Sequence, residues 1–126
     1  MAKKPTPKAS PEPIPEEIHP QNATEYVRRG WLYYSQGKYE HAEADFSAAL
    51  ESRPEDVDTH YALGLTLKNR GQQQSAIQVF EKVIELAENI EDRVRSRMVI
   101  RLAKGHIQEM VHGDWNLENE IWQNKS

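Results

Sequence analysis

Histidines and carboxylates are the side chains of this sequence that could bind a metal ion or transfer protons. The five histidines are scattered along the chain, at His19, His41, His60, His106 and His112. No two of them have the four-residue spacing of a helical metal site, and there is no cysteine to add a thiolate ligand. We therefore expect no metal site and no cofactor, and we expect His60 to be a partly buried structural residue.

The acidic residues occur in neighbouring pairs, such as Glu43 with Asp45 and Glu55 with Asp56. General acid–base catalysis needs paired groups in a dry pocket. These pairs instead fall on expected solvent faces or at helix starts, where a carboxylate favours the helix dipole. No glycine-rich phosphate loop or nucleophile motif is present. The sequence therefore predicts a protein that is not an enzyme.

A basic stripe follows one face of a long expected helix and consists of Arg93, Arg97, Arg101 and Lys104. At 100° per residue these cations span an arc of about 80°. Neighbouring like charges repel by roughly 0.2–0.5 kcal/mol per pair, so an acidic neighbour is expected. It could be Glu81, Glu85 and Glu88 of the preceding helix, or an acidic segment of a partner. Nucleic acid is disfavoured because the net charge is −4 and no aromatic residue interrupts the stripe.

Composition sets the broad class of the chain. Its 126 residues are enough for one domain, with 37% hydrophobic and 29% charged residues. No apolar run approaches the roughly 20 residues that span a bilayer. Prolines follow Met1-Ala2-Lys3-Lys4 where a secretory signal would have its apolar stretch. We expect a cytoplasmic protein that does not bind membranes.

The N-terminal segment is rich in proline, because six of the seven prolines lie in the first 20 residues. Proline fixes φ and lacks an N–H group, and such a segment buries too little surface to fold. We predict a disordered tail over residues 1–21. It could act as a linker, or it could reach into an aromatic groove of the same chain, since polyproline II rises about 3.1 Å per residue.

The rest of the chain predicts helices only. Asn22 and Glu25 have the spacing of a capping box. Gly37, Gly71 and Gly113 each follow an apolar run, where a left-handed C-cap favours glycine. No stretch alternates apolar and polar residues as a strand would. The expected helices span about 22–36, 39–52, 56–70, 73–88 and 90–112, with a short one near 115–123.

The sequence also repeats itself. A shift of 34 residues aligns identical residues: Gly30 with Gly64, Gly37 with Gly71, Ala42 with Ala76 and Phe46 with Phe80. A period of this length with two helices per repeat is typical of a helical solenoid. Small residues let the two antiparallel helices of a pair approach to about 8–10 Å, and the phenylalanine fills the remaining space.

These residues resemble the pattern of the tetratricopeptide repeat (TPR) family over about 23–88. The first repeat matches at Tyr26, Gly30, Tyr33, Gly37, Tyr39, Ala42, Phe46, Ala49, Leu50 and Pro54. The second matches at Leu63, Gly64, Leu67, Gly71, Ala76, Phe80, Val83 and Ile84. The chain departs from the pattern at Arg29, where leucine is usual, at His60, where a large apolar residue is usual, and at Glu88, where proline is usual.

The resemblance implies an all-α fold, a short right-handed solenoid of antiparallel helix pairs. The domain would cover 22–126, with repeats at about 23–56 and 57–90. About three repeats are needed to bury a core, so we expect a divergent third unit over about 91–123, closed by a short C-terminal capping helix. Gly113 lies 42 residues after Gly71 rather than 34, which implies about two extra turns in the long helix.

In this family the first helix of each pair lines a concave groove that binds proteins. The matching positions here include Val27, Trp31, Tyr34, Tyr61, Leu65, Lys68 and Asn69. An aromatic strip with a polar rim suits a peptide anchor; the alternative is that the long third helix covers these residues as core. Some relatives bind chaperone tails with a carboxylate clamp, which Val27, Trp31 and Ala62 could not form here.

We therefore expect an adaptor or scaffold that binds a peptide segment of another protein in this groove. The alternative is a structural self-assembly module, either a homo-oligomer or a subunit of a larger complex. Its contact would be the C-terminal end of the solenoid, with Trp115 and Trp122.

Overall fold

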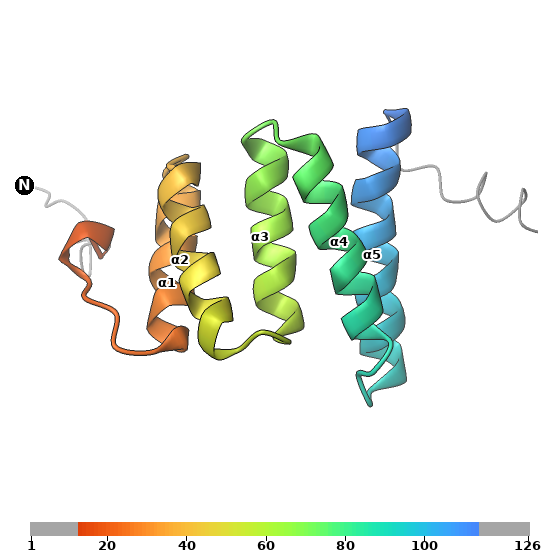
Figure 1. Ribbon diagram of the computed structural model, residues 1–126, viewed down its shortest axis with the longest axis horizontal. Helices are drawn as coiled ribbons and strands as arrows, with labels where there is room; N and C mark the ends of the chain where they lie inside the picture. Colours follow the sequence, from red (N-terminus) through yellow and green to blue (C-terminus); the bar gives the residue numbers. More distant parts are fainter. Residues whose placement is uncertain (1–12, 114–126) are drawn as a thin grey trace, which may run out of the picture.

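The computed structural model describes residues 13–113, and every regular element in that range is a helix. The elements are η1 (Pro15–Glu17), α1 (Ala23–Ser35), α2 (Tyr39–Ser52), α3 (Val57–Asn69), α4 (Gln73–Ala87) and α5 (Arg93–His112) (Figure 1). The all-α prediction is confirmed, and the ends of the five predicted long helices are right to within three residues. The short helix expected near 115–123 lies outside the described residues.

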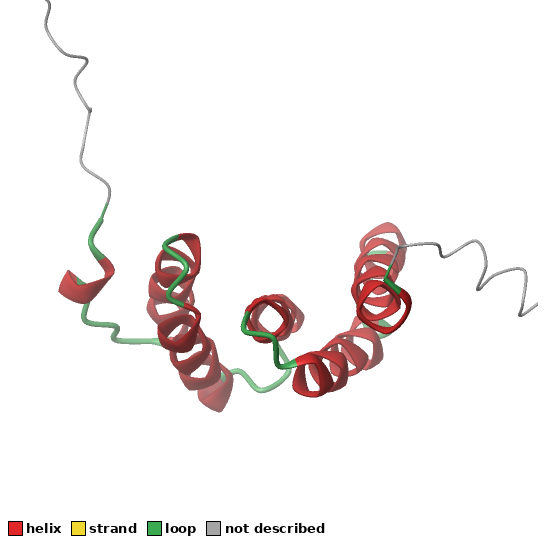
Figure 2. Ribbon diagram, turned by 90° about the horizontal axis from the view of Figure 1, so that it is seen from above, coloured by secondary structure: helices red, strands yellow, loops and turns green. Residues whose placement is uncertain are grey.

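The five α-helices form a curved double layer. Seen from above, α1, α3 and α5 lie along the concave side of the curve, and α2 and α4 lie along the convex side (Figure 2). Each helix packs on its neighbours in the chain, α1 on α2 through to α4 on α5. This is the arrangement of a helical solenoid, in which the first helix of each pair lines the inner surface.

Local sequence signals begin and end the helices where expected. The side-chain oxygen of Asn22 accepts the N–H of Glu25 at 3.0 Å, and the Glu25 carboxylate accepts the N–H of Gln21 at 2.7 Å. In the usual capping box the carboxylate accepts the N–H of the cap residue, which here would be Asn22. In this protein it accepts the N–H of the residue before the cap, Gln21. At the other end, Gly37 and Gly71 have φ of 76° and 80°, which reverses the chain after α1 and α3.

A glycine packed against a phenylalanine joins the two helices of each repeat. Phe46 and Phe80 are completely buried. A Cβ atom on Gly30 would lie 2.7 Å from the Phe46 ring, and one on Gly64 would lie 2.8 Å from the Phe80 ring. The two contacts are 34 residues apart in the chain and therefore occupy equivalent positions in the two repeats. In each helix pair, the phenylalanine ring packs directly on the helix backbone at the glycine.

The long helix α5 is attached to the end of the second repeat. Its buried Ser96 hydroxyl donates to the Ala87 carbonyl oxygen at 2.8 Å, where α4 ends. Asp92 caps the first turn of α5 by accepting the N–H groups of Val94 and Arg95. Val99 and Ala103 join the apolar core of α3 and α4. The helix thus occupies the place of the first helix in a third pair.

The departure from the family pattern at Arg29 has a partner that the sequence interpretation missed. Asp45, expected on a solvent face, is buried at 3% exposure. Arg29 donates to both of its carboxylate oxygens at 2.8 Å and also to the Ile18 carbonyl oxygen at 3.0 Å. One guanidinium group therefore ties together α1, α2 and the segment that precedes α1.

The predicted tail boundary needs correction as a result. The proline content predicts a disordered tail up to residue 21, but Pro15 is buried and η1 packs against α1. Lys38 also pairs with Glu16 at 2.9 Å. This segment lies at the N-terminal end of the solenoid, beyond α1 and α2 (Figure 2). The burial of Pro15 and the hydrogen bond from Arg29 to the Ile18 carbonyl oxygen hold this segment in place, which the composition does not indicate. Residues 1–12 lie outside the described range.

Replacing Gly64 with alanine tests the close contact with Phe80. Helix propensity alone predicts that Gly64→Ala stabilises the protein by roughly 0.5–1 kcal/mol. Because the new methyl group would overlap a buried ring, we expect a loss of about 1–3 kcal/mol instead. Urea unfolding measures the change, with the exposed Ser75→Ala as control; a gain in stability for Gly64→Ala would contradict the packing.

The Arg29–Asp45 pair can be tested by removing one partner or both. Arg29→Leu leaves the Asp45 carboxylate buried without its cation, which we expect to cost about 3 kcal/mol. Arg29→Leu with Asp45→Ala removes the stranded charge and should regain part of that loss. Urea unfolding of the wild type, of the single variants Arg29→Leu and Asp45→Ala, and of the double variant gives the coupling energy. A double variant at least as unstable as the sum of both single variants would contradict the ion pair.

Candidate functional site

The concave surface carries an exposed tryptophan. Trp31 projects from α1 with 39% of its surface exposed. Its ring meets the rings of Tyr34 and Phe46 edge to face, each with centroids 5.2 Å apart. Phe46 is completely buried, so the tryptophan rests on the core of the first repeat while its outer side faces solvent. Edge-to-face contacts of this kind hold an aromatic side chain in place.

A cavity of about 480 Å³ lies beside this tryptophan, between α1 and the start of α3. Its lining residues are Thr24, Val27, Trp31, Arg53, Asp56, Asp58, Thr59 and Tyr61. Three of the seven predicted groove residues, Val27, Trp31 and Tyr61, therefore line one hollow. The lining is also charged, because it includes Arg53, Asp56 and Asp58.

The second half of the predicted groove is occupied from α5. The Tyr61 hydroxyl is 2.9 Å from His106 Nε2, and the Lys68 ammonium is 3.0 Å from His106 Nδ1. Lys68 also forms an ion pair with Glu109. The His106 ring stacks on Phe80 with centroids 4.9 Å apart and an interplanar angle of 11°. Helix α5 thus covers the α3 part of the predicted groove, as the second alternative expects, whereas Trp31 on α1 stays exposed.

The electrostatics of this contact fix the state of His106. Burial and the nearby Lys68 charge lower the pKa of His106 to about 4, while Glu109 acts in the opposite direction. An ammonium can only donate, so Nδ1 accepts from Lys68 and the ring proton is on Nε2, which donates to the Tyr61 hydroxyl. Burial also raises the pKa of Tyr61, so that residue keeps its proton at neutral pH.

The remaining predicted residues serve internal contacts. The Asn69 side-chain amide donates to the Tyr34 hydroxyl at 2.7 Å and to the Leu65 carbonyl at 3.1 Å. The Leu65 side chain packs against the core of α3, α4 and α5. The structure therefore separates the seven residues into three that line the cavity and four, including Lys68, that hold α1, α3 and α5 together.

A second, more apolar cavity of about 220 Å³ adjoins the first on the α5 side. It is lined by Asp58, Tyr61, Arg95, Met98, Val99 and Leu102, so Asp58 and Tyr61 belong to both cavities. Arg95 donates to the two carboxylate oxygens of Asp58 at 2.8 and 2.9 Å. The concave surface is thus one row of two hollows that meet at Tyr61, with a salt bridge along its edge.

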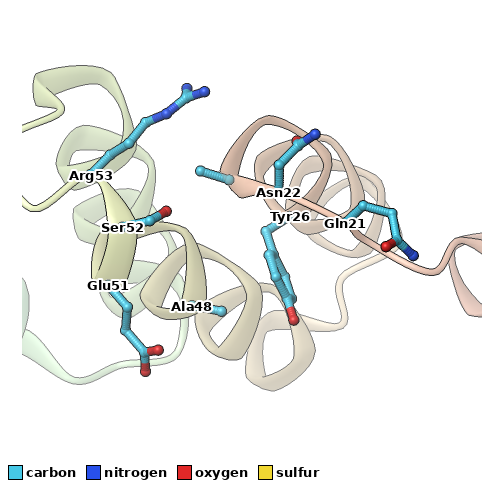
Figure 3. Close-up of a pocket in the computed structure, with 8 residues that line it drawn as sticks. Gln21, Asn22, Tyr26, Ala48, Glu51, Ser52 and Arg53 are labelled. Atoms are coloured by element: carbon cyan, nitrogen blue, oxygen red, sulfur yellow. The ribbon is translucent and has the colours of Figure 1, made fainter.

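A third cavity, of about 570 Å³, lies between the start of α1 and the end of α2 (Figure 3). Tyr26 is the one aromatic residue among those that line it. Arg53 lines both this cavity and the one beside Trp31, and its guanidinium donates to the Thr24 hydroxyl at 2.9 Å. Despite its larger volume, this hollow offers fewer apolar anchors than the one beside Trp31.

Comparison with known proteins identifies the family. The model of the tetratricopeptide repeat family matches residues 27–89, half of the 126-residue chain. The match begins in α1 and ends just after α4. The chain belongs to the tetratricopeptide repeat family. TPR domains are generally protein–protein interaction modules without catalytic activity.

A TPR repeat-containing protein of Methanocaldococcus jannaschii is 31% identical over 81 residues. The aligned region covers 57% of this chain but 14% of that relative. The chain therefore spans only a small part of the relative's length.

The basic stripe lies on the exposed side of α5 of this TPR domain, where Arg93, Arg97, Arg101 and Lys104 are all exposed. Within residues 13–113 none of the four forms an ion pair; Arg93 donates to backbone carbonyl oxygens of Glu88 and Ile90. The expected neutralisation by Glu81, Glu85 and Glu88 is not formed in this range. A contact with an acidic partner stays a prediction.

Some predictions concern features that the described residues contain only in part. Between residues 13 and 113 there is no cluster of three histidine or acidic side chains able to hold a metal ion. No helix in the described part of the chain is long and apolar enough to cross a membrane. His60 is half-buried and donates to the Pro54 carbonyl oxygen at 2.8 Å. Trp115 and Trp122, expected at a self-assembly contact, lie outside the described residues.

Sequence reasoning missed His106, the central residue of the α3–α5 contact. It appeared as one of five scattered histidines because its partners are 38 and 45 residues away in the chain. No motif in the sequence marks such a contact. The Asp58–Arg95 salt bridge, whose members are 37 positions apart in the chain, was missed for the same reason.

The lowered pKa of His106 predicts how stability depends on pH. In the unfolded chain a histidine takes up a proton near pH 6.5, whereas in the folded protein His106 does so near pH 4. Between these values the unfolded state binds more protons, so stability falls as the pH decreases. We expect urea unfolding of His106→Gln to lose less stability than the wild type between pH 7 and pH 5. Equal losses in the two proteins would contradict the neutral buried imidazole.

Proposed function

We propose that this TPR domain binds a peptide segment of a partner protein in the cavity beside Trp31. One observation carries the proposal: an exposed tryptophan on the concave side of the fold adjoins a cavity of about 480 Å³ between α1 and α3. Binding sites for small ligands and side chains usually have about 300–1,000 Å³. Exposed aromatic side chains at the centre of a contact tend to supply most of its binding energy.

The chemistry of the lining suggests what the segment would look like. Trp31, Val27 and Tyr61 offer aromatic and apolar surface to one large side chain of the ligand. Arg53, Asp56 and Asp58 can meet polar or charged groups next to that anchor. We therefore expect the partner segment to carry an aromatic or aliphatic anchor between groups of mixed charge.

The arrangement of α5 limits the site. Tyr61 and Lys68 already have hydrogen-bond partners on α5, so Lys68 is not available as a cation for the ligand. Asn69 donates to Tyr34 and to the backbone of its own helix. The part of the groove that we propose for binding is therefore the α1–α3 half, centred on Trp31.

Selection from a displayed library of random peptides provides ligands even though the natural partner is unidentified. Peptides that bind the wild type are then measured against Trp31→Ala and against Thr24→Arg, which places a long side chain in the cavity from an exposed position. We expect both changes to weaken binding by about tenfold or more, the size of a hot-spot loss. Circular dichroism and unfolding confirm that each variant is folded.

The matched control is Val94→Ala, which removes an exposed apolar side chain from α5 outside the cavity beside Trp31. It should leave the affinity for the selected peptides unchanged. If peptides bind with equal affinity to the wild type, Trp31→Ala and Thr24→Arg, the proposed site is wrong. If Val94→Ala weakens binding instead, the binding surface lies on α5.

A further inference from the structure

Two contacts between α3 and α5 fix the second hollow of the concave surface. Arg95 donates to the Asp58 carboxylate, and His106 bonds to the Tyr61 hydroxyl. Asp58, Tyr61 and Arg95 all line the hollow of about 220 Å³. Because both contacts join the same two helices, they fix the distance across the hollow before any ligand is present. A site that is fixed in this way loses little conformational freedom when a ligand enters.

Two large apolar residues of α5 line the hollow and stay open to solvent. Met98 and Leu102 are 55% and 38% exposed. Together with Arg95 and His106 they follow spacings of three, four and four residues, which places all four on one side of the helix. That side faces α3, on the concave side of the curve (Figure 2). Large apolar side chains exposed around a hollow usually mark a contact surface.

The size of the hollow suits one aliphatic side chain. An apolar cavity of about 150 Å³ is enough to bind benzene, so a hollow of about 220 Å³ can take the side chain of leucine, isoleucine or methionine. Val99, which also lines it, belongs to the core of α3, α4 and α5. The polar groups of the lining are those of Asp58, Arg95 and Tyr61. An anchor in this hollow would therefore have an apolar end and polar neighbours.

Arg95 has unused hydrogen-bond donors at this place. A guanidinium group carries five N–H bonds, and Nη2 alone makes the two bonds to Asp58, at 2.8 and 2.9 Å. Within residues 13–113, neither Nε nor Nη1 of Arg95 forms a hydrogen bond. The side chains of Arg95 and Asp58 are 42% and 73% exposed, so groups of a ligand can reach them.

The charge of α5 favours an acidic ligand. The helix carries five cations against one carboxylate, that of Glu109, which pairs with Lys68. Asp58 neutralises Arg95, but the other four cations of α5 have no ion pair within residues 13–113. The field around the helix is therefore positive, and complementary charge attracts and orients a partner.

We propose that the partner segment carries a second anchor, an aliphatic side chain that fills the hollow between α3 and α5, with an acidic side chain next to it that bonds to Arg95. This proposal rests on the function proposed above and extends the ligand from the cavity beside Trp31. The two hollows share Asp58 and Tyr61, so one peptide can pass from one to the other. An extended peptide points every second side chain to the same side, at intervals of about 7 Å, and can therefore fill both.

One titration reports on the two anchors at once. The probe is a synthetic peptide from the displayed library whose affinity falls with Trp31→Ala. It is titrated into the full chain labelled with nitrogen-15 and with carbon-13 in the methionine methyl groups. We expect the Trp31 indole N–H and the Met98 methyl signals to shift and to saturate at the same peptide concentration. The methyl signal of half-buried Met110, which does not line the hollow, should move little.

Paired changes in the peptide and the protein test the aliphatic anchor. Replacing that anchor with alanine should weaken binding by about tenfold and abolish the Met98 shift, while the Trp31 shift remains. Leu102→Trp fills the hollow and should weaken the parent peptide by a similar factor, but it should leave the affinity of the alanine peptide almost unchanged. Circular dichroism checks folding; Met98→Ala, at a more exposed position, is the second variant, with an expected loss of about threefold.

The acidic side chain is tested with two arginine variants that remove the same charge. Arg95→Gln should weaken binding by about three- to fivefold, the size of an exposed ion pair. The effect should vanish when the acidic residue of the peptide is replaced by its amide. Arg97→Gln is the matched control, because Arg97 is exposed and lies about 160° away around the helix; it should leave the affinity almost unchanged.

The outcomes separate this proposal from the function on which it rests. If the Trp31 signal shifts and the Met98 signal does not, the second anchor is wrong and the function proposed above stands. If no selected peptide depends on Trp31, both proposals fail. Equal losses for Arg95→Gln and Arg97→Gln would overturn the bond to Arg95, since the acidic side chain would then respond to the overall charge of α5 alone.

Discussion

The fold depends on the contact between a helical glycine and a buried phenylalanine ring, which occurs once in each repeat. Phe46 lies against Gly30 and Phe80 against Gly64, at distances that leave no room for a side chain on the glycine. These contacts set the spacing within each helix pair, and the pairs set the curve of the solenoid. The curve in turn places α1 and α3 so that Trp31 and Tyr61 line the same cavity. A change of even one methyl group at this contact would therefore alter the concave surface as well as the core.

Helix α5 gives the two halves of that surface different properties. It supplies His106, whose ring stacks on Phe80 and whose Nε2 bonds to the Tyr61 hydroxyl. His106 thereby connects the Gly64–Phe80 contact of the second repeat to the groove. Because burial and Lys68 keep His106 neutral, the contact adds no buried positive charge beside the lysine. The same helix leaves the Trp31 half open and presents an apolar and basic outer face of its own. One helix thus completes the core, closes part of the groove and offers a second surface.

The parts of the structure that the sequence predicted arise from local or repeated features. Helix starts at Asn22 and turns at Gly37 and Gly71 depend on a few neighbouring residues, and the glycine–phenylalanine contacts recur at a fixed offset. The features it missed join residues far apart in the chain, such as Arg29 with Asp45 and Tyr61 with His106. For the Arg29–Asp45 pair, the departure from the family pattern at Arg29 was the one signal in the sequence. No signal in the sequence marked the contact between Tyr61 and His106. The order of residues 15–21 was also missed, since proline content says nothing about the burial of Pro15.

A nitrogen-15 titration with a library-selected peptide tests most directly whether a ligand binds this TPR domain beside Trp31. The Trp31 indole N–H and the backbone amides of Thr24 and Val27 are expected to shift together and saturate at one affinity. Signals from α2 and α4 should move little, because those helices lie along the convex side of the curve (Figure 2). If the largest shifts instead map to α2 and α4, or to the outer face of α5 while Trp31 stays unchanged, the concave cavity is not the binding site.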